Sequence, residues 1–194
     1  MGKKFIFNKI NFNFSTVSER LREDAFLLKG IEMVLIDERS EREEHYHYEH
    51  GLEEFISWLN SGKHKSISKI VSFDDTAHEI ETEIALQFND GYSENIVSFV
   101  NLVRTGDGGT HEMGFKSGLT KVFNEYARKY ELLKKKDKNL EGSDVREGLT
   151  AIISIKVPEE LLQFEGQTKG KLGTPIARNI LEQVTIEQLT YYLE

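Results

Sequence analysis

Hydrophobic residues recur at helical spacing near the start of the chain. An apolar side chain appears at every third or fourth position, which predicts a helix over 15–29. The recurring residues are Val17, Leu21, Ala25 and Leu28. Thr16 and Glu19 can form a capping box at the start of this helix, and Gly30 is expected to end it.

A short β-rich run and a second helix follow. Residues 31–37 predict a strand, with residues 46–48 as its hairpin partner and the charged segment 38–44 between them. Residues 51–60 predict a helix that buries Leu52, Phe55, Ile56 and Leu59. The periodicity then changes from helical to alternating around residues 61–65, so we expect a domain boundary there, with one part over 1–62 and another over 63–194.

Three strands are expected after this boundary, at 69–74, 79–89 and 95–103. In the second of them, inward Ile80, Thr82 and Ile84 alternate with outward Glu79, Glu81 and Glu83. The remaining pattern predicts a long helix capped by Thr110 and running to residue 133, a helical turn at 144–149, an interior strand at 151–157 and a helix from Thr174 to residue 193 with Pro175 at its first position. This order indicates an α+β fold, a mixed β-sheet with helices packed on one face.

Composition narrows the classes of function. The net charge of −8 argues against a general nucleic-acid coat protein, although the run Lys134–Lys138 is open to two interpretations, a solvated helix end or a contact with DNA phosphates. Cysteine is absent, which excludes thiol catalysis and thiolate metal sites. No apolar stretch is long enough to span a membrane and the start lacks the features of a signal peptide, so a cytoplasmic location is expected.

The most informative loop is Gln167-Thr168-Lys169, which lies between a predicted strand and a predicted helix. An ammonium and a side-chain amide at one loop tip can meet a terminal phosphate with a point charge and a hydrogen-bond donor. A solvated surface loop is the alternative interpretation of these residues taken alone.

The run from Pro158 to Thr174 closely resembles the loop that joins the ATPase and transducer regions in B subunits of bacterial type IIA topoisomerases. Three other stretches fit the same family, at 85–96, 107–112 and 144–151. The resemblance covers nearly the whole chain. The run at 136–144 and the segment 159–164 are more similar to the topoisomerase IV branch than to the gyrase branch.

The resemblance implies a fold and a domain organisation. Residues 63–194 would form the transducer domain, with its unusual left-handed βαβ crossover. Residues 1–62 would be the C-terminal portion of a GHKL-type ATP-binding domain. The sequence shows neither the Glu-plus-Asn helix nor the adenine pocket of that domain, so the chain alone is not expected to hydrolyse ATP.

The resemblance also implies roles for particular residues. Lys169 would reach the γ-phosphate of ATP, Gln167 would hydrogen-bond to the same phosphate, and Lys116 would face DNA between two transducer domains. Magnesium would be bound by the ATPase portion that this sequence lacks. The implied partners are DNA, the topoisomerase A subunit in an A2B2 heterotetramer, and a second B subunit when ATP closes the clamp.

Other polar motifs have structural explanations beside functional ones. Residues 107–112 can be a glycine-rich start of a helix, or a loop near the nucleotide with His111 as a polar contact. His45 and His47 share one strand face, but no third ligand follows at a fixed spacing, so no metal site is predicted. Asp144, Arg146 and Glu147 favour capping and an ion pair over acid–base chemistry.

Three functions remain open at this stage. The first is the transducer of a type IIA topoisomerase B subunit, of the topoisomerase IV or the gyrase kind, which couples the nucleotide state to the DNA gate. The second is a stand-alone α+β module that binds nucleic acid or protein, and the third is a mismatch-repair relative with the same architecture. The lack of interleaved aromatic and basic residues disfavours the second.

Overall fold

The computed structural model describes residues 12–62 and 65–194. By its internal contacts the chain divides into two compact units, Met1–Glu54 and Phe55–Glu194. The division falls within helix α2 (Leu52–Asn60). The assignment of 1–62 and 63–194 to two family domains stays a prediction.

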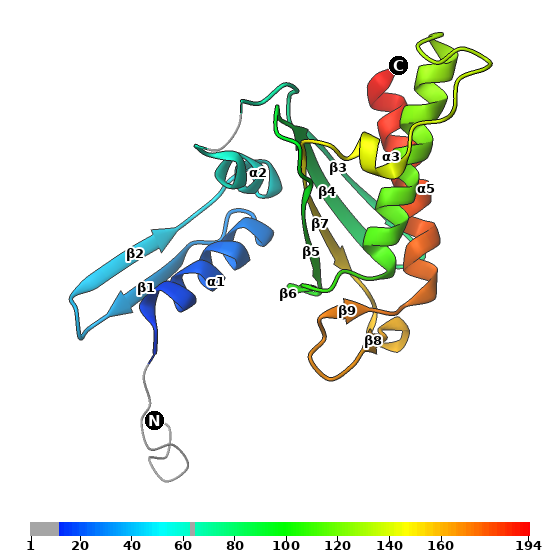
Figure 1. Cartoon of the computed structure of the whole chain (residues 1–194). Coiled ribbons are helices and arrows are strands. Elements are labelled where there is room, and N and C mark those ends of the chain that lie inside the picture. Colours follow the sequence, from blue (N-terminus) through cyan, green and yellow to red (C-terminus); the bar gives the residue numbers. More distant parts are fainter. Residues whose placement is uncertain (1–11, 63–64) are drawn as a thin grey trace. The chain divides into compact units, whose positions relative to one another are not determined.

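The first unit is a helix packed on a β-hairpin (Figure 1). Helix α1 (Phe14–Leu27) is followed by the antiparallel strands β1 (Met33–Asp37) and β2 (Arg42–Tyr46). Ala25 and Phe26 of α1 are buried, and the Phe26 ring stacks on Tyr48 with 3.8 Å between ring centroids. This small cluster holds the helix against the hairpin.

Two details of this unit differ from the expectation. Asn13 caps α1, because its side-chain oxygen accepts the N–H of Thr16 at 3.2 Å, so the capping box of Thr16 and Glu19 is wrong. The charged residues Arg42–Glu44 belong to the second strand, whereas the sequence placed them in the connection. From Glu43 to Tyr46, exposed side chains alternate with half-buried or buried ones, which suits a strand with one solvated face.

The second unit contains a five-stranded mixed sheet in the order β3-β4-β7-β5-β6. The strands are β3 (Val71–Ala77), β4 (Ile80–Phe88), β5 (Asn95–Val100), β6 (Val103–Arg104) and β7 (Leu149–Lys156). Only the β5–β7 pair is parallel, for example at Val97↔Ile152, and the chain crosses between them through a helix. The hand of this crossover stays a prediction.

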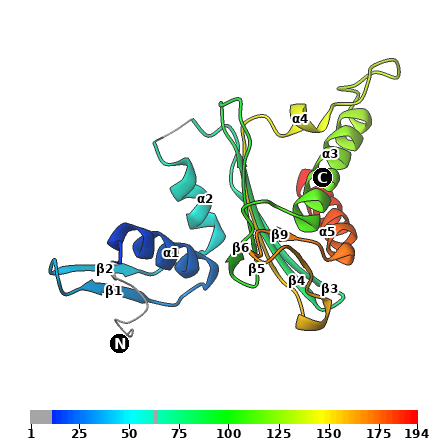
Figure 2. The ribbon, with the colours of Figure 1, turned by 60° about the horizontal axis from the view of Figure 1, so that its bottom comes forward.

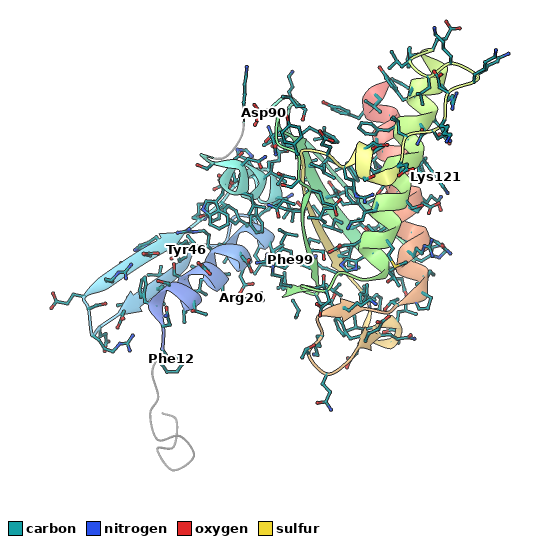
Figure 3. All side chains as sticks on the ribbon, in the orientation of Figure 1. Phe12, Arg20, Tyr46, Asp90, Phe99 and Lys121 are labelled. Atoms are coloured by element: carbon teal, nitrogen blue, oxygen red, sulfur yellow. The ribbon has the colours of Figure 1, made fainter. Side chains whose placement is uncertain are left out.

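Helices α3 (Thr110–Lys129) and α5 (Pro175–Leu193) pack on one face of this sheet, as both ribbon views show (Figures 1 and 2). Ile84 of β4, Ile153 of β7 and Leu119 of α3 are fully buried in the core between the layers. On the other face lies Phe99 of β5 (labelled in Figure 3). The centroid of its ring is 6.1 Å from that of Phe55. Ile152 and Ile153 follow each other in β7 and are both fully buried, so this strand is covered on both faces, which explains its apolar centre. The predicted α+β fold is confirmed.

Several boundaries in this unit were predicted inaccurately; the helical turn expected at 144–149, for example, is helix α4 (Gly142–Val145). The expected strand 95–103 is broken by Asn101 and Leu102, whose positive φ angles of 49° and 66° make a tight turn between β5 and β6. Helix α3 ends at Lys129, four residues early. Thr110 does not cap α3; Gly109 holds the cap position, and the Thr110 hydroxyl donates to the carbonyl of Thr174 at 2.7 Å.

Candidate functional site

The Gln167-Thr168-Lys169 segment forms the tip of a small hairpin. A 3-10 turn, η1 (Glu159–Leu161), leads into β8 (Phe164–Glu165), which pairs antiparallel with β9 (Lys171–Leu172). Gly166 enters the tip with φ of 84°, a conformation that favours glycine. Gln167 and Lys169 are thus brought together at an exposed tip, as the sequence predicted.

The backbone at Lys169 is itself unusual. Its φ of 56° lies in the left-handed region, which costs an L-residue other than glycine roughly 1–2 kcal/mol. Such conformations persist where the surroundings hold them, and they cluster at ligand-binding loops. The hairpin therefore keeps a lysine at a position where glycine would be favoured by backbone energy.

The two lysines of this hairpin have different electrostatic surroundings. Lys171 Nζ lies 2.8 Å from Glu165 Oε2, across the β8–β9 register, and this hydrogen bond raises the pKa of Lys171. Within the described part of the chain, Lys169 forms no ion pair, and its Nζ lies 6.0 Å from the centroid of the Phe164 ring. The charge of Lys169 is available to an anion, whereas that of Lys171 is already neutralised.

The hairpin rests on the loop before α3. Asp107 donates its backbone N–H to the carbonyl of Gly170 at 2.8 Å, and Leu172 donates to the carbonyl of Gly108 at 3.0 Å. Gly109 and Leu172 form a parallel bridge. Strand β9 therefore pairs with β8 on one edge and with this loop on the other, and the side chain of Leu172 is fully buried.

A buried polar cluster lies directly behind this contact. His111 is fully buried, and its Nε2 is 3.0 Å from the hydroxyl of Thr105. The Thr105 hydroxyl is 2.5 Å from that of Ser98, which donates to Glu112 Oε1 at 2.6 Å. Burial lowers the pKa of His111 to about 4, so the imidazole is neutral at neutral pH. This fits a polar contact and not a proton carrier.

Lys116 belongs to a different cluster, further along α3. Its Nζ is 3.1 Å from Glu94 Oε1 and 3.8 Å from Glu112 Oε2, and Arg146 also pairs with Glu94. Burial raises the pKa of Glu94, but hydrogen bonds from Arg146 and Lys116 outweigh it and leave the pKa below its usual value. Lys116 and Arg146 line a pocket of about 550 Å³ between α3 and residues 139–146.

The remaining candidates have structural partners. His45 contacts Glu32 and Glu43, and His47 contacts Glu49, which raises the pKa of both imidazoles through these hydrogen bonds. The Asp144 carboxylate accepts the N–H of Glu141 at 2.8 Å as part of a capping box for the short helix α4 (Gly142–Val145).

In residues 12–62 and 65–194, no helix combines the length and the apolarity that crossing a membrane requires.

Sequence reasoning missed Ser98 and Thr105 as parts of this region. They lie on β5 and just beyond β6, separated by a turn where the sequence predicts a continuous strand. Once that turn folds the chain back, Thr105 donates its N–H to the carbonyl of Ser98 at 2.9 Å and the two hydroxyls meet. The polar Ser98 within an otherwise apolar strand was the available signal.

Comparisons with known proteins show the family to which the chain belongs. Residues 51–194 match the family model described as DNA gyrase B. The chain is 61% identical over 189 residues to the B subunit of DNA topoisomerase 4 from Bacillus subtilis and 59% identical over 191 residues to that from Enterococcus faecalis. Each alignment covers 97% of this chain. The chain itself spans only 29% of the length of the first relative and 28% of the second.

Solved structures support the same assignment. The 43K ATPase domain of Thermus thermophilus gyrase B superposes with a TM-score of 0.86 at 35% identity, covering 98% of this chain and 51% of that one. The topoisomerase IV ATP-binding domain of Francisella tularensis gives 0.78 at 25% identity, covering 98% and 50%. The resemblance inferred from the sequence is confirmed, and the chain belongs to the family of DNA gyrase B and the topoisomerase IV B subunits.

Proposed function

We propose that this chain is the transducer region of a topoisomerase IV B subunit, preceded over residues 1–62 by the end of its ATP-binding domain. Lys169 and Gln167 contact the γ-phosphate of ATP, and the transducer passes the nucleotide state to the DNA gate of an enzyme that moves one duplex through another. The identities of 61% and 59% to two topoisomerase 4 B subunits, each over 97% of the chain, favour topoisomerase IV over the gyrase alternative.

The observation that carries this proposal is the difference between Lys169 and Lys171. Both lie on one small hairpin, but Glu165 neutralises only Lys171. A cation held at an exposed tip on a left-handed backbone, without a carboxylate partner among the described residues, suits an incoming anion. The described residues near the tip thus fit a phosphate group.

The chemistry assigned to this tip is electrostatic. The Lys169 ammonium donates to an oxygen of the terminal phosphate and neutralises charge as the phosphoryl group is transferred. The Gln167 amide donates a hydrogen bond to the same group, with less effect because it carries no charge. Magnesium and the adenine would be held by parts of the ATPase domain outside this sequence.

The proposal includes the partners of the intact enzyme. These are DNA, an A subunit in an A2B2 assembly in the cytoplasm, and a second B subunit on ATP-driven closure. Lys116 is the proposed contact with the DNA backbone. Because Glu94 and Glu112 already share its charge, a DNA phosphate has to compete with these two carboxylates.

The test uses a complete topoisomerase IV B subunit that carries this sequence, together with its A subunit. Lys169→Ala should slow ATP turnover about 100-fold or more, because charge stabilisation of the transition state is lost. Lys169→Arg should restore little, since a planar guanidinium does not replace a compact ammonium. Gln167→Ala should cost about tenfold or less, as expected for a neutral donor.

The matched control is Lys171→Ala, on the same hairpin. It removes a lysine whose charge is already paired at a half-exposed site, so turnover should stay within about threefold of the unmodified protein. DNA cleavage by the assembled enzyme should survive in all these variants. Unchanged turnover in Lys169→Ala would show that the loop does not act on the γ-phosphate.

A further inference from the structure

We infer that Gly109 is a positioning residue for Lys169, acting through the seat that residues 107–110 provide for the hairpin. This inference rests on the proposed function of Lys169. Gly109 lies at the N-cap of α3, some sixty residues before the loop in sequence, and has no side chain that could touch a nucleotide. Its role is to let the backbone of β9 approach.

The approach is close enough to require glycine. A Cβ at Gly109 would lie 2.4 Å from the carbonyl oxygen and 2.5 Å from the nitrogen of Leu172, far inside van der Waals contact with backbone atoms. Gly109 also has φ of 143°, which residues with a side chain rarely adopt. Any side chain at this position must push β9 away from α3.

The hairpin is attached at two places, the seat and its own base. Beside the Gly109–Leu172 bridge, the N–H of Asp107 holds the carbonyl of Gly170, next to Lys169 in sequence. At the base of the hairpin, the Thr174 hydroxyl donates to the carbonyl of Leu161 at 2.9 Å and accepts the N–H of Gln163 at 3.0 Å. The tip that carries Lys169 is therefore oriented by its base and by this seat.

The seat is rigid because it is anchored to the sheet. Thr105 and His111 flank it in sequence and contact each other, and Thr105 contacts Ser98 of β5. Thr110 donates to Thr174, which joins the first residue of α3 to the residue that precedes α5. A shift of β9 relative to Gly109 cannot be absorbed by these buried partners, so it moves the tip.

Such a shift matters more for transition-state contact than for fold. A displacement of about 1 Å in a catalytic group can cost roughly 100-fold in rate, because the contact depends on distance and direction. ADP makes no use of a γ-phosphate contact. Loss of the seat should therefore slow turnover while leaving ADP affinity nearly unchanged.

The experiment compares two glycines of one segment in the complete B subunit. Gly109→Ala should slow ATP turnover about 30-fold or more and change ADP affinity less than about threefold. Gly106→Ala is the matched control. A Cβ there meets no atom within 4 Å, so turnover should stay within about twofold.

The double variant Gly109→Ala with Lys169→Ala separates positioning from general damage. If Gly109 acts through Lys169, the double variant should be no more than about threefold slower than Lys169→Ala alone. Losses that multiply would overturn the inference, as would normal turnover in Gly109→Ala. If Lys169→Ala itself leaves turnover unchanged, the proposed function fails as well, so the two failures are distinguishable.

A second variant covers the case in which Gly109→Ala does not fold. Thr174→Val removes the hydroxyl that ties the hairpin base to Leu161 and Gln163, and this hydroxyl makes no capping bond to α5. Turnover should fall about tenfold with ADP affinity retained, and the loss should again vanish in a Lys169→Ala background. Persistence of the loss in that background would contradict the inference.

Discussion

His111 is a buried titratable residue, and the fold stabilises its neutral form. Its Nε2 has Thr105 as partner, and its Nδ1 has no hydrogen-bond partner among the described residues. Burial lowers the pKa to about 4 from an ordinary 6.5. Protonation would place a charge beside the seat of the hairpin, where the ring contacts no carboxylate of the described residues.

This lowered pKa predicts how stability depends on pH. The unfolded chain takes up the proton near pH 6.5 and the folded chain only near pH 4, so stability is full above pH 6.5 and falls as the pH drops through this window. At pH 5 the loss from this residue should be on the order of 2 kcal/mol. Urea unfolding at pH 7.5 and pH 5 measures it.

His111→Gln is the variant for this measurement, because an amide keeps a polar atom near Thr105 and does not titrate. It should lose less stability between the two pH values than the unmodified chain. His45→Gln is the control of opposite sign, since the raised pKa of His45 stabilises below pH 6.5 and this contribution is lost as the pH rises. Equal pH dependence of His111→Gln and the unmodified chain would contradict the account.

Individual site residues were only partly predictable. From the residues alone, Lys169 and Lys171 are two loop lysines, and only the family resemblance singled out the first. The physical difference between them depends on the register that places Glu165 opposite Lys171, which a two-residue strand does not specify from its sequence. In the same way, the contact between Gly109 and Leu172 joins residues far apart in the chain, and no local sequence pattern predicts it.

At the scale of elements, helices α3 and α5 approach each other through two glycines. A Cβ at Gly114 would lie 2.2 Å from the carbonyl oxygen of Arg178, and one at Gly118 would lie 2.8 Å from that of Glu182. Glycine is normally unfavourable inside a helix by about 1 kcal/mol. Here the absence of a side chain at Gly114 and Gly118 lets the backbones of α3 and α5 pack closely over the sheet.

Gly114→Ala should therefore destabilise the chain although alanine is the better helix former. The clash with Arg178 should outweigh the gain in helix propensity and lower the free energy of unfolding by about 1–3 kcal/mol. Glu125→Ala, at an exposed position of the same helix, should change it by less than about 0.5 kcal/mol. A stabilised Gly114→Ala variant in thermal or urea unfolding would show that the helices do not pack as described.

The elements themselves were largely predictable, and their ends were not. Alternation in β4 and helical spacing in α1, α3 and α5 follow from burial of one face, which is a repeated local signal. The caps depend on single side chains. Asn13 lies just before the expected helix, and its side-chain oxygen accepts the N–H of Thr16. Thr110 is similarly diverted from capping by Thr174, a tertiary partner that the sequence around Thr110 does not reveal.

At the scale of the whole molecule, the hairpin tip that carries Lys169 is the group assigned to the nucleotide, and the sequence shows no adenine or magnesium motif of the family. One lysine on one phosphate cannot offset the loss of freedom of a bound nucleotide. This 194-residue chain alone should therefore bind ATP with a dissociation constant of about 1 mM or weaker. Calorimetry tests this, and micromolar affinity would reveal a nucleotide pocket that this account does not contain.

The most direct test of the central claim is the affinity of the complete B subunit for ADP and for a non-hydrolysable ATP analogue, before and after Lys169→Ala. If Lys169 contacts the γ-phosphate, the variant should lose about tenfold or more in affinity for the triphosphate and keep its affinity for ADP within about twofold. Equal weakening of both nucleotides, or full retention of the triphosphate affinity, would contradict the claim that this loop senses the γ-phosphate.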